Sequence, residues 1–249
     1  MRLPVRFSAS IVAVAVLALC AGARTEAQDT AGQSSSSQGS PPQSTPDQPS
    51  LNGTYISIDP LALVRYDNRF DISLGMAYDH MKAGPNLLQG SNLGGLDLSG
   101  TMWLSKHWGA EASGRGYLGT SGAAPNAPNN IKGPFVSEYF FTAGPEWLGP
   151  HNKHGALIAH ALVGGVYGMF ENDLLGQSPS VVGFYNNQLA LAGIVGGHID
   201  LNRSARWVFR ITPDAVITRY GINYGNKITQ TDVNFAISVG LEYKFKKKR

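Results

Sequence analysis

The sequence predicts an all-β fold, an 8-stranded antiparallel up-and-down transmembrane β-barrel. Eight segments alternate apolar residues with small or polar ones, the period of a strand whose two faces differ. The connections between these segments alternate in length, and aromatic residues collect on the apolar face beside the short connections. The longest apolar run, 11–21, has eleven residues, whereas a membrane-spanning helix needs about 20. The chain is therefore expected to cross a membrane with strands.

The composition limits the alternatives. Of the 249 residues, 43% are apolar and 15% are charged. Such a chain is too apolar for a disordered protein and too poor in charge for a typical soluble helical domain. The only cysteine, Cys20, excludes a disulfide framework and cysteine-based metal sites. The net charge of +3 reflects a basic tail at 244–249, so we expect no nucleic-acid partner.

The first 27 residues have the basic, apolar and small-residue regions of a secretory signal peptide. We expect cleavage after Ala23 or Ala27. A buried N-terminal strand is one alternative. A lipoprotein signal at Cys20 is another, although Leu19 stands where such a signal needs a small residue.

A second segment, 28–50, differs from the rest in composition. Ser, Gln and Pro make up 16 of its 23 residues, and none is aromatic. Such a segment cannot offset the ordering cost of about 1–2 kcal/mol per residue. The predicted organisation is therefore a signal peptide at 1–27, a disordered Ser/Gln/Pro-rich spacer at 28–50 and a barrel at 51–249. A cell-wall or partner-binding role for the spacer is the alternative.

The strand period is clearest near the C-terminus. From Phe235 to Phe245 every odd position is apolar, whereas the even positions hold Ala, Ser, Gly, Glu and Lys. This is a strand longer than the usual 5–6 residues. The same period predicts seven more strands at 69–81, 95–104, 108–119, 134–147, 155–170, 188–201 and 206–219. No segment gives a convincing helical period.

The connections indicate how the strands are arranged. Those at 105–107, 148–154 and 202–205 are short, whereas those at 82–94, 120–133, 171–187 and 220–231 are long. An up-and-down barrel places all the short turns at one end and all the long loops at the other. Transmembrane barrels have this asymmetry, with short turns on the periplasmic side.

The aromatic residues indicate which face meets lipid. Six of them lie on the apolar face at the short-turn ends and predict an aromatic girdle: Phe70, Trp108, Trp147, Trp207, Tyr243 and Phe245. The opposite face is rich in small and charged residues: Asp71, Asp97, Glu111, Arg115, Glu138, His160, Arg210, Asp214 and Glu242. A soluble sandwich or lipocalin-like barrel, with its apolar face inward, is the alternative. Trp103 departs from the pattern, since its position in the period points it inward.

These features resemble the small bacterial outer-membrane β-barrel family of the OmpA/OmpX-like type, over about 69–245. The last strand closes on Leu241-Glu242-Tyr243-Lys244-Phe245, which resembles the C-terminal recognition signal of that family. The resemblance implies localisation in the bacterial outer membrane. It implies outer-membrane lipid and the assembly machinery as partners, the latter through the C-terminal strand, and a monomer. Residues 246–249 follow Phe245 and depart from the family pattern.

Strand pairing predicts ion pairs inside the barrel. The short turn at 105–107 places Asp97 opposite Arg115, with Glu138 on the next strand. On the other wall, His198 is predicted opposite Arg210, with Asp200 diagonal to it. The predicted lumen charge network comprises Asp97, Arg115, Glu138, Glu111, His198, Arg210 and Asp214. Because the lumen of an eight-stranded barrel is usually filled by side chains, we expect these charges to plug it.

No motif predicts catalysis. The only acid–His pair near an outer strand end is Asp79-His80, which lacks a matching Ser. His198 and Asp200 lie at the periplasmic end, and the turn histidines His151 and His154 have no carboxylate beside them. We therefore expect no enzyme, no cofactor and no metal site.

Three functions remain compatible with the sequence. The first is a mainly structural or surface-interacting outer-membrane barrel with a charged, plugged lumen. The second is a narrow pore or a carrier for small or apolar molecules, which needs an open lumen or a lateral gap at Gly164, Gly165 and Gly168. The third, a soluble ligand carrier, requires the apolar face to point inward.

Overall fold

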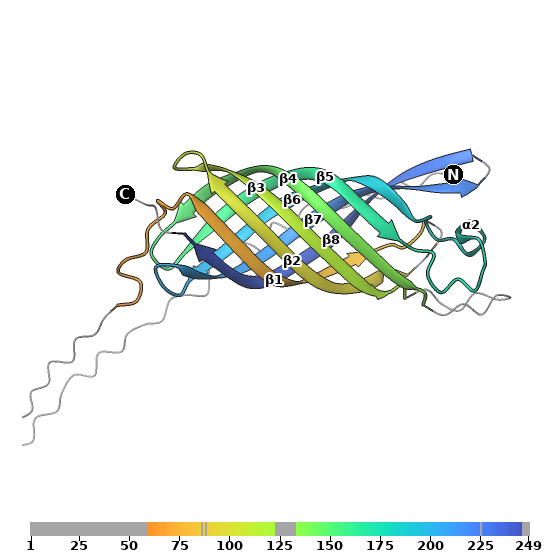
Figure 1. The fold of residues 1–249 in the computed structure, drawn as a ribbon, viewed down its shortest axis with the longest axis horizontal. Helices are drawn as coiled ribbons and strands as arrows, with labels where there is room; N and C mark the ends of the chain where they lie inside the picture. Colours follow the sequence, from red (N-terminus) through yellow and green to blue (C-terminus); the bar gives the residue numbers. More distant parts are fainter. Residues whose placement is uncertain (1–58, 86, 88, 123–132, 225, 246–249) are drawn as a thin grey trace, which may run out of the picture. The chain divides into compact units, whose positions relative to one another are not determined.

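The computed structural model describes residues 59–245, except 86, 88, 123–132 and 225. Eight antiparallel strands form a closed barrel in sequence order, and β8 pairs with β1 (Figure 1). The strands are β1 (Phe70–Met81), β2 (Ser91–Trp103), β3 (Trp108–Thr120), β4 (Phe135–His151), β5 (Gly155–Met169), β6 (Gln188–Asn202), β7 (Trp207–Tyr224) and β8 (Asn226–Lys244). The predicted fold class is confirmed. The predicted signal peptide and spacer lie outside the described residues.

Each strand turns one face to the lumen and the other outward. Along β1, Asp71 and Asp79 are buried, whereas Leu74 and Met76 are 58% and 76% exposed. The same alternation places large apolar side chains on the outside of every strand. Because the ring is closed, its backbone hydrogen bonds leave no open sheet edge. A closed barrel with an apolar outer face is suited to a bilayer, and the soluble alternative with an inward apolar face is wrong.

Two connections are shorter than predicted, 82–94 because β2 begins at Ser91 and 148–154 because β4 continues to His151. The largest difference lies between β7 and β8. The segment 220–231, expected to be a long loop, is mostly strand: the β7–β8 ladder continues from Ala215↔Phe235 to Tyr224↔Asn226. In Figure 1 this blue hairpin extends past the other strands. The sequence there mixes β-branched and aromatic residues with polar ones. That composition suits a paired strand in water as well as it suits a loop.

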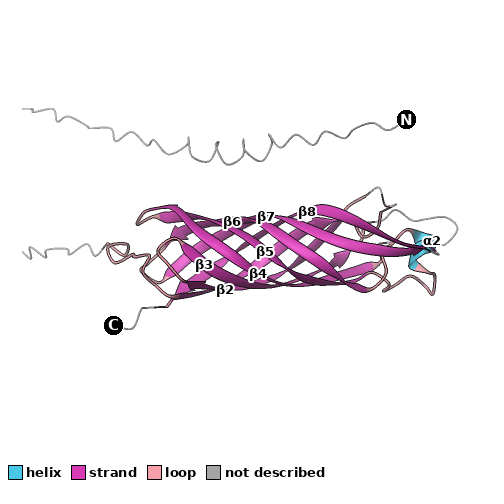
Figure 2. Ribbon diagram, turned by 90° about the horizontal axis from the view of Figure 1, so that it is seen from above, coloured by secondary structure: helices cyan, strands magenta, loops and turns pink. Residues whose placement is uncertain are grey.

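The β5–β6 connection contains a short helix that the sequence did not predict. Helix α2 (Pro179–Val182) is a single turn at the loop end of the barrel (Figure 2). Proline stands at its start, and Gly183 ends it with a φ of 85°, which a residue with a side chain rarely adopts. In the described part of the chain, no helix is long and apolar enough to span a membrane.

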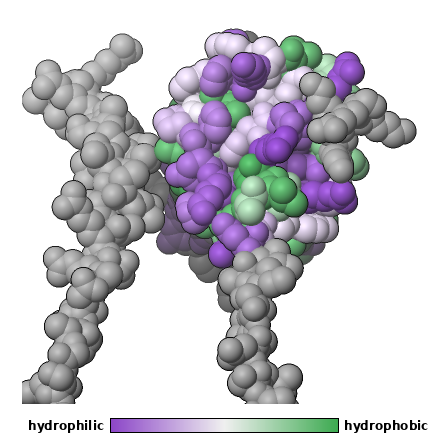
Figure 3. Space-filling model, turned by 90° about the vertical axis from the view of Figure 1, so that its left-hand side faces the viewer, coloured by the Kyte–Doolittle hydropathy of each residue, from purple (hydrophilic) through white to green (hydrophobic). Residues whose placement is uncertain are grey.

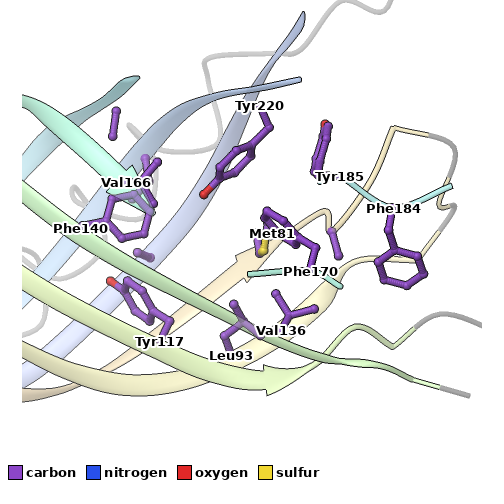
Figure 4. Close-up of a cluster of buried hydrophobic side chains, with 14 of the residues drawn as sticks. Met81, Leu93, Tyr117, Val136, Phe140, Val166, Phe170, Phe184, Tyr185 and Tyr220 are labelled. Atoms are coloured by element: carbon purple, nitrogen blue, oxygen red, sulfur yellow. The ribbon is translucent and has the colours of Figure 1, made fainter. Parts of the chain in front are cut away.

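The lumen has two regions of different character. Apolar and aromatic residues fill the half near the loops, where the β5–β6 connection folds over the barrel and contributes Phe184 and Tyr185 (Figure 4). Charged and polar residues fill the half near the short turns. Viewed from the short-turn end, the described surface is mostly hydrophilic (Figure 3).

Candidate functional site

The candidate site is the polar part of the lumen. Among the described residues, nine carboxyl side chains but only three Arg or Lys side chains are buried in the interior of the barrel. They are Asp71, Asp79, Asp97, Glu111, Glu138, Glu146, Asp200, Asp214 and Glu242, with Arg115, Arg210 and Lys244. Buried charges are costly unless they are paired, so the contacts among these groups determine what the lumen can do.

Arg115 lies at the centre of one group of contacts. The β2–β3 register places it opposite Asp97, and its Nε lies 3.4 Å from Asp97 Oδ1. Its Nη1 reaches across the lumen to Asp214 Oδ2 at 2.6 Å. Ser238 donates a 2.8 Å hydrogen bond to the other oxygen of Asp97. Arg115 thus joins side chains from β2 and β7.

Glu138 is not a partner of Arg115, contrary to the sequence prediction. The β3–β4 ladder places Glu138 opposite Tyr117, whereas Arg115 faces Phe140. Glu138 therefore lies closer to the loop end, where the Tyr220 hydroxyl donates a hydrogen bond to it. The prediction failed because the register across the long 120–133 connection cannot be read from the sequence.

Arg210 pairs with Asp200, not with His198. Its Nε and Nη2 donate to the two Asp200 oxygens at 2.8 and 2.9 Å, and Nη2 also donates to Glu242 at 2.7 Å. The β6–β7 turn lies one residue later than predicted, at 203–206 instead of 202–205, and Asn202 pairs with Val208. This moves the register by two residues and brings Asp200 opposite Arg210. Such a two-pronged arginine–carboxylate pair is among the strongest side-chain contacts.

His198 instead belongs to a group with Glu111 and His160. His160 Nδ1 lies 2.7 Å from Glu111 Oε2 and 3.2 Å from His198 Nε2. His160 Nε2 lies 2.9 Å from Asp214 Oδ1, which links this group to Arg115. The predicted network did not include His160 or Glu146. The alternation of apolar and polar residues could have identified both as lumen residues, because both occupy inward positions of their strands.

Aromatic residues close the lumen at the loop end. Phe170 packs against Tyr220 and Tyr185, with ring centroids 5.0 and 5.6 Å apart. The Tyr185 hydroxyl donates a hydrogen bond to Asp232 on β8. Burial, together with this contact to a carboxylate, raises the pKa of Tyr185. These contacts attach the β5–β6 connection to the barrel.

The segment before β1 covers the short-turn end. Asn202 donates a 2.7 Å hydrogen bond to the Tyr66 hydroxyl, and the Lys244 ammonium lies 4.2 Å from the Tyr66 ring centroid. Partial burial raises the pKa of Tyr66. Trp103, which departed from the outward pattern, donates from its indole to Asp71 at 2.6 Å. Its inward position is thus explained by a buried acceptor.

The six aromatic residues of the predicted girdle lie at the short-turn end. Phe70, Trp108, Trp147, Trp207 and Phe245 are 43–55% exposed, and Tyr243 is partly exposed. Trp108 faces Trp147 across β3 and β4. Trp207 contacts Tyr243, with ring centroids 5.0 Å apart. The described structure therefore presents aromatic rings on the outside of most strands at one level.

The side chains considered for catalysis do not form a catalytic group. Asp79 points into the lumen, whereas His80 points outward and contacts Asn92 at 2.8 Å. His151 contacts the Gly149 carbonyl and stacks on Tyr66. Among the described residues, no hydrogen bond joins Asp79, His80 or His151 to a serine, threonine or cysteine side chain.

Comparison with solved structures gives the class of protein. The outer membrane protein OprG from Pseudomonas aeruginosa matches with a TM-score of 0.50 and 16% identity, over 74% of this chain and 98% of its own. Ail, the attachment invasion locus protein of Yersinia pestis, matches with a TM-score of 0.44 and 18% identity, over 72% and 99%. Neisserial surface protein A matches with a TM-score of 0.42 and 12% identity, over 71% and 97%.

No family model matches the sequence, and no curated protein matches it. At these identities the structural likeness shows the fold. The chain is a closed β-barrel, and its fold is that of the small bacterial outer-membrane barrels of the OmpA/OmpX-like type. This confirms the resemblance seen in the sequence, and the solved proteins that have this fold are bacterial outer-membrane proteins.

Proposed function

We propose that this protein is a closed outer-membrane barrel with a structural or surface-interacting role, carried out by the segments at its loop end. The observation that carries the proposal is the filling of the lumen. Paired charges occupy its middle, an aromatic group occupies its loop end, and Tyr66 and Trp103 lie at its short-turn end. A lumen filled in this way presents a surface to the outside and no path for solutes.

The charged layers support a plug because their members bind each other across the barrel. Arg115 links β2, β3 and β7, and Arg210 links β6, β7 and β8. Breaking one side of such a buried group costs roughly 3–5 kcal/mol. Opening a passage through this region would therefore require breaking several strong contacts together.

The alternative, a narrow pore or a carrier with a lateral gap, has less support. The gap would lie at Gly164, Gly165 and Gly168, where small residues could weaken the wall. Each of these three glycines pairs with β4 on one side and with β6 on the other. The ladder on both sides of β5 is therefore continuous at these positions.

The proposal includes no catalytic role. His160 hydrogen-bonds to Glu111 and Asp214, and these side chains are buried in the lumen. A catalytic group needs a reactive atom beside a space for substrate. The polar lumen in the described chain has its side chains directed at each other instead.

The proposed partners follow from the outer and end surfaces. The exposed apolar belt fits outer-membrane lipid. The C-terminal strand, which pairs with both β1 and β7, is the segment that assembly machinery would need to engage before closure. We expect a monomer, because the ring is complete within one chain.

Electrical recording in planar bilayers tests the closed lumen. The full chain, refolded in detergent and inserted, should show no steady conductance. A combined variant should leak if it removes both the aromatic side chains of the loop half (Tyr117→Ala, Phe140→Ala, Phe170→Ala, Phe184→Ala, Tyr185→Ala, Tyr220→Ala) and the central charges (Asp97→Ala, Arg115→Ala, Asp214→Ala). The outward-facing substitution Phe235→Ala serves as a control that leaves the lumen intact. Steady conductance by the wild-type protein would contradict the proposal and favour the pore.

The surface role is tested on intact cells. Protease added outside should cleave within 171–187 or the β7–β8 hairpin and leave the barrel strands protected. The short turns, such as 203–206, should resist cleavage until the outer membrane is opened. Cleavage at the short turns in intact cells would reverse the proposed orientation.

A further inference from the structure

Four lumen side chains from four consecutive strands converge on one point. They are Glu111 on β3, Glu146 on β4, His160 on β5 and His198 on β6, named here the His–Glu cluster. Three of their atoms, Glu111 Oε2, His160 Nδ1 and His198 Nε2, lie 2.7, 3.2 and 3.3 Å from one another. Glu146 Oε1 lies 3.8 Å from His198 Nε2. Ligand-type atoms from all four residues thus approach the same small region.

Glu146 is an unpartnered group directed into this cluster. Its side chain is 0% exposed, and neither of its carboxylate oxygens accepts a hydrogen bond. The second oxygen of Glu111 is also buried without a hydrogen bond. A buried carboxylate without a partner is costly, and a cation between the two carboxylates would relieve that cost.

Outer contacts hold both imidazole rings in a ligating orientation. Asp214 Oδ1 lies 2.9 Å from His160 Nε2, and Thr212 Oγ1 lies 2.9 Å from His198 Nδ1. Each of these oxygens can accept a hydrogen bond from the N–H of the ring nitrogen that faces away from the cluster. This leaves the lone pairs of His160 Nδ1 and His198 Nε2 directed into it. Metal-binding histidines are typically oriented by such a second contact.

Gly196 makes room for one of these outer contacts. A Cβ atom at this position would lie 2.0 Å from Asp214 Oδ1. The absence of a side chain therefore lets Asp214 reach His160 from β7. Gly196 pairs with His160 on β5 and with Asp214 on β7, so it lies in the ladder between the two side chains that meet.

The charge of the lumen favours a cation in the same place. Nine buried carboxyl groups accompany three buried Arg and Lys side chains in the described chain. Arg115 and Arg210 are held by Asp97, Asp214, Asp200 and Glu242. Among the described residues, neither Glu111 nor Glu146 forms an ion pair with an Arg or Lys side chain. A divalent ion would therefore balance their two negative charges.

The donor set indicates the kind of ion. Two imidazole nitrogens and two carboxylate oxygens suit zinc and related transition metals, whereas magnesium and calcium prefer oxygen ligands alone. With metal–ligand bonds of about 2.0–2.2 Å, tetrahedral ligands lie about 3.3 Å apart. Two of the four distances match this value, those from His198 to His160 and to Glu111, whereas Glu146 would have to approach His198 by about 0.5 Å. Glu111 and His160 would separate by about 0.6 Å to share an ion.

We propose that the His–Glu cluster binds one divalent transition-metal ion of the zinc type, with Glu111, Glu146, His160 and His198 as ligands. The ion is structural: it has four protein ligands, lies inside the filled lumen and ties β3, β4, β5 and β6 together. This differs from the sequence prediction, which considered only the turn histidines His151 and His154. The site does not depend on the proposed surface role.

Zinc titration of the refolded full chain tests the proposal. The protein is treated with EDTA, refolded in detergent, checked for folding by heat-dependent gel mobility and titrated with Zn²⁺ against a chromogenic chelator. Wild-type protein should bind one zinc per chain and unfold at a higher temperature when loaded. His198→Gln should abolish measurable binding, and Glu146→Gln should weaken it at least about 10-fold. Asp214→Asn, which removes an outer contact, should weaken it about 10- to 100-fold.

The matched control is His154→Gln, the same substitution at an exposed histidine in the β4–β5 turn. It should bind zinc as the wild type does. Should His198→Gln fail to fold, the folded wild type loaded with Co²⁺ supplies the second measurement, and it should show the visible absorption of a four-coordinate nitrogen and oxygen site. Substoichiometric zinc in folded wild type, equal affinity of the His198→Gln and His154→Gln variants, or a six-coordinate cobalt spectrum would each overturn the proposal.

Discussion

Arg115 on β3 and Asp214 on β7 form a 2.6 Å ion pair between strands that are not neighbours in the barrel. Asp214 also contacts His160 on β5, so one carboxylate connects a guanidinium to the His–Glu cluster. The two sides of the lumen are therefore joined through side chains as well as through the ring of backbone hydrogen bonds. The stability of the barrel should depend on this link.

Replacing Arg115 by Ala should lower the free energy of unfolding by roughly 3–5 kcal/mol, because Asp97 and Asp214 remain buried without their cation. Urea unfolding in detergent, followed by gel mobility, measures the change. Arg219→Ala is the control, since Arg219 is exposed on the outside of β7, and it should change the free energy by less than about 0.5 kcal/mol. Equal changes in the free energy of unfolding for the two variants would show that the contacts of Arg115 with Asp97 and Asp214 do not stabilise the barrel.

Replacing Asp97, Arg115 and Asp214 together by Ala should cost less than Arg115→Ala alone, because no unpaired charge remains. The same triple variant should still show no steady conductance. Tyr117, Phe140 and Tyr220 continue to fill the lumen on the loop side of these residues. Unfolding and planar-bilayer recordings test both statements, and a conducting triple variant would mean that the charges alone close the lumen.

The Tyr185 contact should give a pH-dependent stability at the loop end. Its folded-state pKa is raised above the ordinary value of about 10. The hydrogen bond to Asp232 is therefore fully present below about pH 10 and is lost as the pH rises further. Tyr185→Phe should be less stable than the wild type by a constant amount from pH 7 to 9. The difference should shrink above about pH 10, and a difference that grows there would contradict the assignment.

Two C-terminal truncations should behave differently. Removing 243–249 deletes the pairs of Tyr243 with Ile72 and with Trp207 and the hydrogen bond from Phe245 to the Phe70 carbonyl. Unpaired backbone groups in lipid cost several kcal/mol each, so assembly should fail. Removing only 246–249 leaves these contacts in place and should preserve assembly. Membrane yield and heat-dependent gel mobility distinguish the two, and equal yields would refute the closure argument.

The sequence by itself determined the strands, their faces and the pairing of Asp97 with Arg115 across the β2–β3 turn, whereas across the β6–β7 turn the predicted register was wrong by two residues. A period of two residues is a local property, and a turn of known length fixes the residues that face each other across it. The sequence alone therefore pairs Asp97 with Arg115, and its alternation places His160 and Glu146 on the lumen face. The extension of β7 and β8 could not be predicted, because polar residues in water are compatible with both a loop and a hairpin.

The tertiary structure decided which lumen residues meet across the barrel. The contacts of Asp214 with Arg115 and His160 depend on the closed ring and on the stagger accumulated over several strands. One long connection of unknown register is enough to move a side chain by two positions, as Glu138 shows. The meeting of Glu111, Glu146, His160 and His198 required four strands to be placed together. Alternation fixes only which face of its strand a residue occupies, whereas its level in the lumen is set by the register of the whole ring.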